Sequence, residues 1–216
     1  MTHRKVLQVL KQAKYLSSRY YIAITNPPYV LRSNLNSRIG GYVQKNYPLS
    51  KTDLGATFIE RLSALVKDQG ILSMVTLQSW MFTPIFEKLR NRIINELCLQ
   101  TMAHIGTRGF ASISGDVVAT SAFTLKKTTA DADGAYVRLV DFTNEEEKRK
   151  AFIKLKDYPY FVNSSVFQEI SGNTISYWLP SNFYKHFKKI PLKISQMLAT
   201  GLLLAITKSL FVTGMK

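Results

Sequence analysis

Apolar residues recur along the first third of the chain with two alternating spacings. Helical spacing over residues 4–17 predicts a basic amphipathic helix, and a β-branched and aromatic run over 20–25 predicts a buried strand. Helical spacing returns after Asp53, a good N-cap, and we expect that helix to end at Gly70. A second buried strand is predicted over 71–77. Helices and strands therefore alternate from the start.

The alternation continues through the middle of the chain. Thr83 followed by Pro84 is typical of a helix N-terminus. Further strands are predicted over 101–105 and 117–125. This order predicts an α/β fold with a largely parallel sheet, covered by helices on both faces and ending in an antiparallel hairpin. Such sheets bind ligands beyond the carboxyl ends of their strands.

The pattern then loosens. A strand over 136–142 and a charged helix over 144–156 are predicted, followed by a mixture of aromatic residues and lysine. We therefore predict a partial catalytic domain at 1–127, the start of a following region at 128–200, and an apolar tail at 201–216.

The first predicted strand stops at the tetrapeptide Asn26–Tyr29 (Asn-Pro-Pro-Tyr), since consecutive prolines continue neither helix nor strand. The Asn26 side chain and the Pro27 backbone each offer a carbonyl acceptor. Aimed at the two N–H bonds of adenine N6, they would localise its lone pair for attack on a sulfonium methyl. Pro28 restricts Pro27 to an extended conformation, and Tyr29 offers a flat face for a flipped base. The alternative is a proline-rich turn that only caps a strand. A polar segment without a predicted element runs on to Lys51.

Six stretches together resemble the amino-methyltransferases of restriction-modification type, and especially the PglX-like adenine-specific methyltransferases of BREX phage-defence systems. They are residues 21–29, 51–61, 70–76, 79–82, 103–110 and 113–118. The likeness runs from about Leu10 to Thr200. It implies methyl transfer from S-adenosyl-L-methionine to adenine N6 in double-stranded DNA, with other phage-defence components as partners.

The resemblance also assigns roles by position. Asn26 and Pro27 would accept hydrogen bonds from the target N6, and Tyr29 would stack on the target base. Phe110 falls where relatives place a second aromatic beside the flipped base. Phe58 falls where relatives contact the adenine of S-adenosylmethionine, although its place in an apolar stripe equally suits a core residue.

The sequence departs from the family pattern at both ends. The family's glycine-containing cofactor loop lies upstream of the first predicted strand, but no glycine precedes Asn26 here. We therefore expect most of the cofactor site to be missing, the fragment to be inactive alone, and an upstream polypeptide to carry the cofactor-binding half. Tyr21 replaces a usual acidic residue. After Gly201 the family continues with polar residues, so a frameshift is our hypothesis for the apolar tail.

Charge and composition limit the kinds of partner and cofactor that we expect for this chain. The chain has 29 Lys and Arg against 14 Asp and Glu, a net charge of +15, which suits a nucleic acid or simply a basic surface. Cys98 is the single cysteine, and His3, His104 and His186 lack metal-ligand spacing, so neither disulfides nor a metal are expected. No signal peptide is recognised, and Lys208 interrupts a tail too short for a membrane span. We expect a cytoplasmic protein.

Two other functions remain open from the sequence. One is a non-enzymatic, basic nucleic-acid-binding remnant. The other is an amino-methyltransferase with the same tetrapeptide that acts on RNA or on a protein side chain. The resemblance at 51–61 and 103–118 argues against this second alternative.

Overall fold

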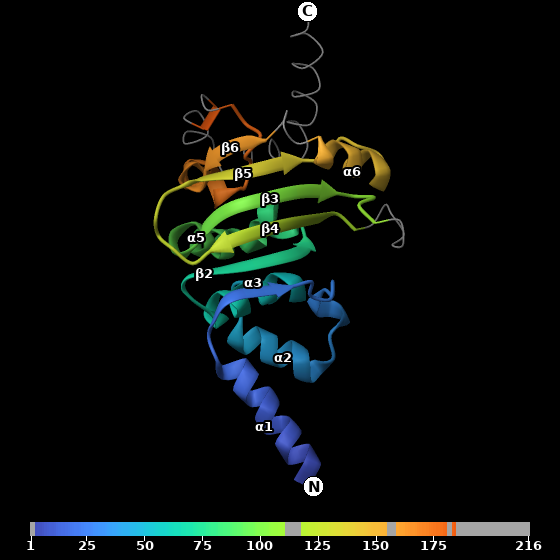
Figure 1. Cartoon of the computed structure of the whole chain (residues 1–216), viewed down its shortest axis with the longest axis vertical. Coiled ribbons are helices and arrows are strands. Elements are labelled where there is room, and N and C mark those ends of the chain that lie inside the picture. Colours follow the sequence, from blue (N-terminus) through green and yellow to red (C-terminus); the bar gives the residue numbers. More distant parts are fainter. Residues whose placement is uncertain (1–2, 111–117, 155–158, 181–182, 185–216) are drawn as a thin grey trace, which may run out of the picture.

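Within the described part of the chain, six strands form a single mixed sheet in the order β1-β2-β4-β3-β5-β6 (Figure 1). This arrangement comes from a computed structural model, which describes residues 3–110, 118–154, 159–180 and 183–184. The strands are β1 Tyr20–Thr25, β2 Val66–Leu77, β3 Cys98–Gly106, β4 Thr120–Lys126, β5 Asp133–Arg138 and β6 Tyr160–Asn163. The α-helices are α1 His3–Ser17, α2 Ser37–Asn46, α3 Leu54–Leu65, α4 Ser79–Phe82, α5 Glu87–Glu96 and α6 Glu145–Ile153.

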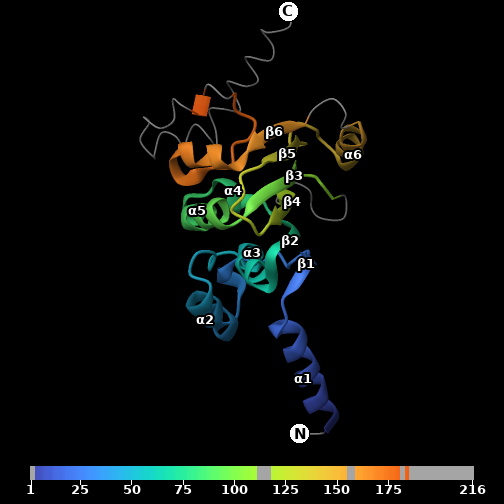
Figure 2. The ribbon, with the colours of Figure 1, turned by 60° about the vertical axis from the view of Figure 1, so that its left-hand side comes forward.

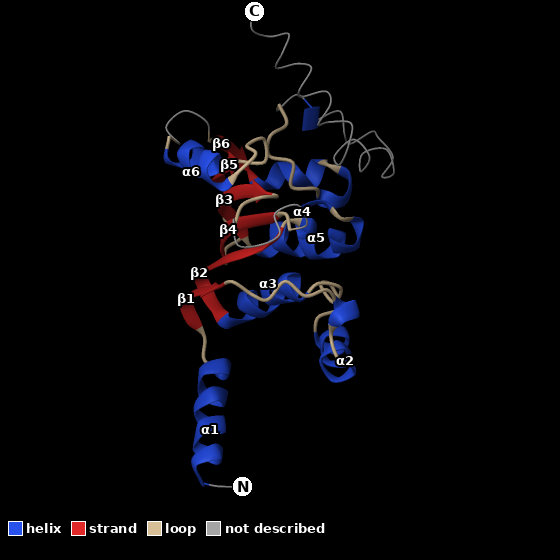
Figure 3. Cartoon of the chain, turned by 90° about the vertical axis from the view of Figure 1, so that its right-hand side faces the viewer, coloured by secondary structure: helices blue, strands red, loops and turns tan. Residues whose placement is uncertain are grey.

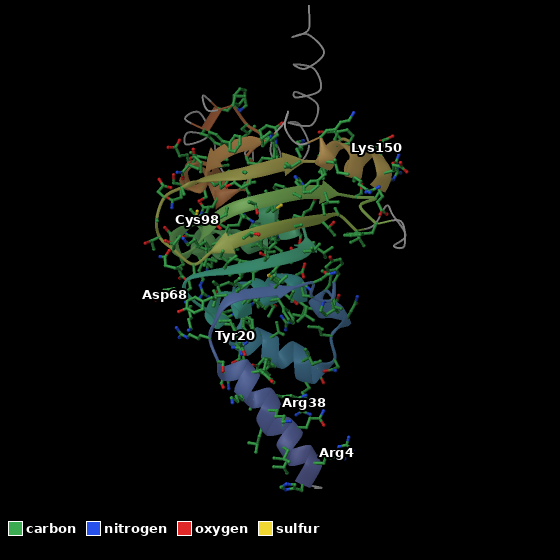
Figure 4. The ribbon with its side chains drawn as sticks, viewed as in Figure 1. Arg4, Tyr20, Arg38, Asp68, Cys98 and Lys150 are labelled. Carbon is green, nitrogen blue, oxygen red and sulfur yellow. The ribbon has the colours of Figure 1, made fainter. Side chains whose placement is uncertain are left out.

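Four of these strands run in the same direction. β1 pairs with β2 and β3 pairs with β5 in parallel, whereas β4 lies antiparallel between β2 and β3. β6 is antiparallel to β5. The α/β class and the antiparallel β3–β4 pair are confirmed. Figure 4 labels Tyr20 and Cys98, the first residues of β1 and β3, on the same side, so the carboxyl ends of these strands lie together at the opposite edge.

Helices cover one face of the sheet. α3, α4 and α5 lie together on this face (Figures 2 and 3). α3 forms because Asp53 caps it and because apolar residues recur at helical spacing, so that Ala56, Ile59 and Leu62 enter the core. One continuous cluster joins these side chains to Leu72 of β2. The sheet and its helices therefore share one core.

The prediction that helices cover both faces is wrong for most of the second face, where the described residues place only α6, at the β5 end (Figure 3). On the face away from α3 and α5, the side chains of Ile22 and Ile24 in β1 are 62% and 75% exposed. A hollow of about 870 Å³ follows this open face and ends at Phe152 of α6. Its floor consists of uncharged side chains, including Ser73, Val75, Thr101, Ala103, Ala122 and Thr124. Strand periodicity shows that a face is apolar, but not which segment will cover it.

Several predicted boundaries differ from the structure. The polar segment before Lys51 contains helix α2, which the sequence pattern did not predict. α3 ends at Leu65 rather than at Gly70, which lies inside β2. A Cβ on Gly70 would sit 2.7 Å from the carbonyl oxygen of Lys67, so a larger residue would not fit this turn of the strand.

The region after residue 127 continues the same sheet. β5 pairs with β3, and β6 pairs with β5, although both follow the predicted domain boundary. The division into 1–127 and 128–200 stays a prediction, and the predicted tail at 201–216 lies outside the described residues. Within the described ranges, every helix is too short or too polar to cross a membrane.

Candidate active site

The tetrapeptide lies where β1 ends, at the carboxyl edge of the sheet. The Asn26 side chain is exposed, while Pro27 is buried beneath it. Pro27 packs against the first turn of α3, where a Cβ on Gly55 would lie 3.8 Å from Pro27 Cγ and 3.1 Å from Asp53 Oδ1. A glycine at this position therefore lets the helix approach the turn closely. The packing leaves Asn26 facing outward on a fixed base.

Backbone hydrogen bonds hold the chain that leaves the turn. The amide of Arg32 donates to the Thr52 carbonyl at 3.0 Å, and the amide of Leu54 donates to the Val30 carbonyl at 3.0 Å. Segments 30–32 and 52–54 thus form a short antiparallel clip beside the tetrapeptide. The clip ties the turn to the start of α3.

Asp53 joins the clip to its surroundings. Its Oδ1 accepts from the amides of Gly55 at 2.7 Å and Ala56 at 3.4 Å, so Asp53 is the expected helix cap. Its Oδ2 accepts from the Ser79 hydroxyl at 3.4 Å. Burial raises the pKa of the Asp53 carboxyl, and the hydrogen bonds from Ala56, Gly55 and Ser79 oppose that shift. The Asp53 carboxylate therefore has a structural role, because its oxygens bind the start of α3 and Ser79.

The predicted aromatic residues lie in different surroundings. Tyr29 is half-buried, and its enclosed hydroxyl has no hydrogen-bond partner within the described part of the chain. Burial raises the pKa of this phenol. Phe110 is exposed in the segment after β3, at the same edge as Asn26. Phe58 is half-buried on α3 and packs against the core. The stacking and cofactor roles of these residues stay predictions.

The structure adds a buried polar group that the sequence pattern did not reveal. Nε2 of His104 in β3 lies 2.7 Å from Oε1 of Gln78, the residue after β2, and Nδ1 lies 3.2 Å from the Tyr177 hydroxyl. Burial, assisted by the positive charges of Arg138 and Lys148, lowers the pKa of His104 to about 3. The only signal in the sequence was a histidine within an apolar strand, which usually marks a core position.

The described residues do not by themselves make a site for S-adenosylmethionine. The acidic group that packs beside the tetrapeptide is Asp53, which caps α3, and Phe58 faces the core. The hollow on the open face reaches Asn26, but its lining is uncharged and mostly apolar, which does not suit a sulfonium cofactor with an amino-acid end. Among the described residues no cluster of His, Cys, Asp and Glu could hold a metal ion.

Comparisons with a family model and with known proteins all match methyltransferases. A family described as "Eco57I restriction-modification methylase" matches residues 5–110. The adenine-specific methyltransferase PglX of Lacticaseibacillus casei (strain Zhang) is 40% identical over 176 residues, covering 79% of this chain and 15% of that protein. The adenine-specific methyltransferase BrxX of Escherichia coli O9:H4 (strain HS) is 32% identical over 188 residues, covering 87% of this chain and 16% of that protein.

The chain belongs to the PglX-like adenine-specific methyltransferases. It spans only about a sixth of the length of the curated relatives it matches. A solved structure, the DrdV–DNA complex, shares the fold with a TM-score of 0.52 at 15% identity, over 72% of this chain and 18% of that one. Family membership and fold are thereby established, and residues 26–29 fall within the matched family region.

Proposed function

We propose that this chain carries the target-amino-group half of an N6-adenine-specific DNA methyltransferase that acts in phage defence. The observation that carries the proposal is the tetrapeptide at the end of β1, with Asn26 exposed on a buried Pro27. A turn that served only to cap the strand would not need an outward amide on so rigid a support. Membership of the PglX-like family supports adenine as the target.

The chemistry requires positioning rather than a strong base. The N6 lone pair of adenine is delocalised into the ring, so N6 attacks a methyl donor poorly. In our proposal the side-chain carbonyl of Asn26 and the backbone carbonyl of Pro27 accept hydrogen bonds from the two N6–H groups and favour a tetrahedral nitrogen. The bond from N6 to the methyl carbon would form as the carbon–sulfur bond of the donor breaks, a neutral thioether would leave, and one N6 proton would be released to solvent. Tyr29 and Phe110 hold the flipped base by stacking. Preorganised dipoles of this kind are each worth about 10²–10³-fold in rate.

We further propose that a segment bearing the cofactor site adds at the free edge of β1 and covers the open face of the sheet. This segment belongs either to an upstream polypeptide or to more of the same chain. Among the described strands, β1 pairs only with β2, so its other edge is free to accept a strand. S-adenosylmethionine bound there would supply the methyl group. The exposed Ile22 and Ile24 and the uncharged hollow support an apolar covering segment.

Double-stranded DNA is the proposed substrate, and other phage-defence components are proposed as partners. The net charge of +15 suits a phosphate backbone. Helix α1, whose side chains are exposed, projects from the body and includes Arg4, Lys5, Lys11 and Lys14 (Figure 1). Charge alone fits equally well a nucleic-acid-binding remnant without catalysis. That alternative requires salt-sensitive DNA binding and no methyl transfer.

The test is a chimaera. The 176 matched residues of the Lacticaseibacillus casei relative are replaced by those of this chain, and DNA, RNA and protein acceptors are offered with labelled S-adenosylmethionine. We expect N6-methyladenine in DNA alone. Methylation of RNA or protein would overturn the choice of substrate. A folded chimaera that binds DNA without methylating it would favour the non-enzymatic remnant.

A further inference from the structure

The buried His104 and the half-buried Gln78 connect the carboxyl ends of β3 and β2, the two strands that flank β4, at the edge that carries Asn26. His104 is 3% exposed, and its Nε2 lies 2.7 Å from Gln78 Oε1. An amide oxygen can only accept, so the ring proton lies on Nε2 and Nδ1 accepts from the Tyr177 hydroxyl. The low pKa of His104 keeps the ring neutral near pH 7, which preserves this single arrangement.

Aromatic packing fixes the plane of the imidazole. The ring centroid of His104 lies 5.7 Å from that of Phe82, 6.1 Å from that of Trp178 and 6.1 Å from that of Tyr177. These rings come from the segments after β2 and after β6. Because aromatic rings surround the imidazole, it cannot rotate towards another hydrogen-bond partner. Its Nε2–H group is therefore a fixed donor to Gln78.

Gln78 also binds the residue that precedes β4. Its backbone amide donates to the Ala119 carbonyl at 2.9 Å, while its side chain holds His104 near the end of β3. Close packing continues beyond His104, because a Cβ on Gly109 would lie 2.4 Å from Ile105 Cγ2. The segment that carries Phe110 therefore starts from a strand end that the Gln78 side chain holds through His104. The chain returns to the sheet at Ala119, whose carbonyl binds the backbone amide of the same glutamine.

The neighbouring residue, Ser79, contacts the support of the tetrapeptide. Ser79 donates to Asp53, which caps α3, and the first turn of α3 packs on Pro27 through Gly55. Gln78 and Ser79 are consecutive, so one short segment contacts both the support of Asn26 and the support of Phe110. The segment therefore links the two supports directly, in addition to the sheet that they share.

We propose that Gln78 and His104 are positioning residues, which set the Phe110 segment against the Asn26 turn so that a flipped adenine meets both. The proposal rests on the proposed function, because it assumes that Phe110 contacts the base. Neither positioning residue touches the substrate. If the hydrogen bond between Gln78 and His104 only stabilised the fold, its removal would loosen the whole chain. Residues 105–110 would then lose no more order than the other residues.

The first experiment tests the anchor without catalysis. Amide hydrogen exchange over 105–110 is measured in Gln78→Met, which keeps the shape but removes the acceptor, and in Gln78→Glu, which restores an acceptor. We expect exchange about tenfold faster in Gln78→Met and close to wild type in Gln78→Glu. The ¹⁵N shifts of the His104 ring should show the Nε2–H tautomer in the wild type and in Gln78→Glu, and a loss of tautomer preference in Gln78→Met.

A matched control separates anchoring from stability. Leu125→Ala removes a fully buried side chain from β4 and destabilises the fold without touching the glutamine. Equal exchange at 105–110 in Leu125→Ala and Gln78→Met, at equal loss of stability, would overturn the proposal. Failure of Gln78→Glu to restore slow exchange would also overturn it.

The second experiment tests the consequence in the chimaera. We expect Gln78→Met to lower kcat about tenfold with little change in KM for DNA, and Gln78→Glu to recover most of kcat. An unchanged kcat, or a change confined to KM, contradicts the positioning role. If the unsubstituted chimaera methylates nothing, the proposed function fails, while the exchange experiment still decides whether the anchor exists.

Discussion

At the scale of single residues, Asn26 combines exposure with a rigid support. Its side chain is exposed and stands on the buried Pro27, so removing the amide should leave the fold intact. We expect Asn26→Ala in the chimaera to lose about 10²–10³-fold in kcat, because one preorganised acceptor is gone. Quantifying N6-methyladenine in digested DNA measures this loss.

The matched control is Asn46→Ala, which removes an exposed amide from the end of α2. It should retain full activity and a similar melting temperature. If both variants methylate equally well, Asn26 is not a catalytic residue and the tetrapeptide is only a turn.

The neutral state of His104 makes a prediction about acid. Its pKa is lowered to about 3 in the folded chain, against about 6.5 when unfolded. Between these values the unfolded state binds the extra proton, so the stability is intact above pH 6.5 and falls as the pH drops towards 3. From pH 7 to pH 5 the free energy of unfolding should fall by about 2 kcal/mol through this group.

Urea unfolding at pH 7 and pH 5 measures this change in the free energy of unfolding for the wild type and for His104→Gln. The glutamine has no titrating ring, and its amide can donate to Gln78. Other groups titrate equally in both proteins, so the difference between their pH dependences isolates the histidine. Parallel pH dependences in the two proteins would show that His104 is protonated in the folded state near pH 5.

The site was only partly accessible from the sequence, and the residues show why. Asn26–Tyr29 could be identified because four adjacent residues carry the signal and lie next to an apolar strand. The pair of Gln78 and His104 could not, since 26 positions separate them and their contact depends on β2 and β3 flanking β4. Chemistry carried by adjacent residues is readable, whereas chemistry assembled across strands requires the register of the sheet.

At the scale of elements, helix α3 supports the turn through its capping residue. Removing the Asp53 carboxylate leaves the amides of Gly55 and Ala56 and the Ser79 hydroxyl without their acceptor. We expect Asp53→Ala to lower the free energy of unfolding by about 1–2 kcal/mol. Asp53→Asn, which keeps one oxygen acceptor, should lose less than half as much.

Urea midpoints of the two variants provide the measurement, and Asp133→Ala is the control, since Asp133 is an exposed acid at the start of β5. A loss from Asp53→Ala no larger than that from Asp133→Ala would mean that the cap contributes nothing. It would also remove the physical link between α3 and the tetrapeptide.

Elements with strong apolar periodicity could be predicted, and the others could not. α3 and α5 have buried stripes that set them apart from loops. α2 has Gly40 and Gly41 in its centre and few apolar residues, so its helical propensity is low and packing by Gly40 and Val43 decides its structure. The position of β4 between β2 and β3 also lies beyond periodicity, which does not show which strands pair.

At the scale of the whole molecule, the two faces of the sheet differ in what covers them. One face is packed under α3, α4 and α5, while α6 lies on the other face only at its β5 end (Figure 3). Among the described residues the rest of that face is an uncharged hollow. An apolar face of this size favours association with another surface. The same face that is proposed to receive the cofactor-bearing segment should therefore drive self-association when that segment is absent.

This expectation can be tested with one lysine placed on either side of the molecule. Ala122 lies on β4 at the centre of the open face, so the side chain of Ala122→Lys would project into the hollow and leave the core unchanged. Gln168→Lys adds the same charge at an exposed position on the helix-covered side. We expect sedimentation velocity to show concentration-dependent association of the wild type and of Gln168→Lys, and about tenfold weaker association of Ala122→Lys, because an ammonium group resists burial. Equal association of the two variants would place the contact elsewhere, for instance on the exposed apolar side chains of α1. The open face would then have no demonstrated affinity for a covering segment.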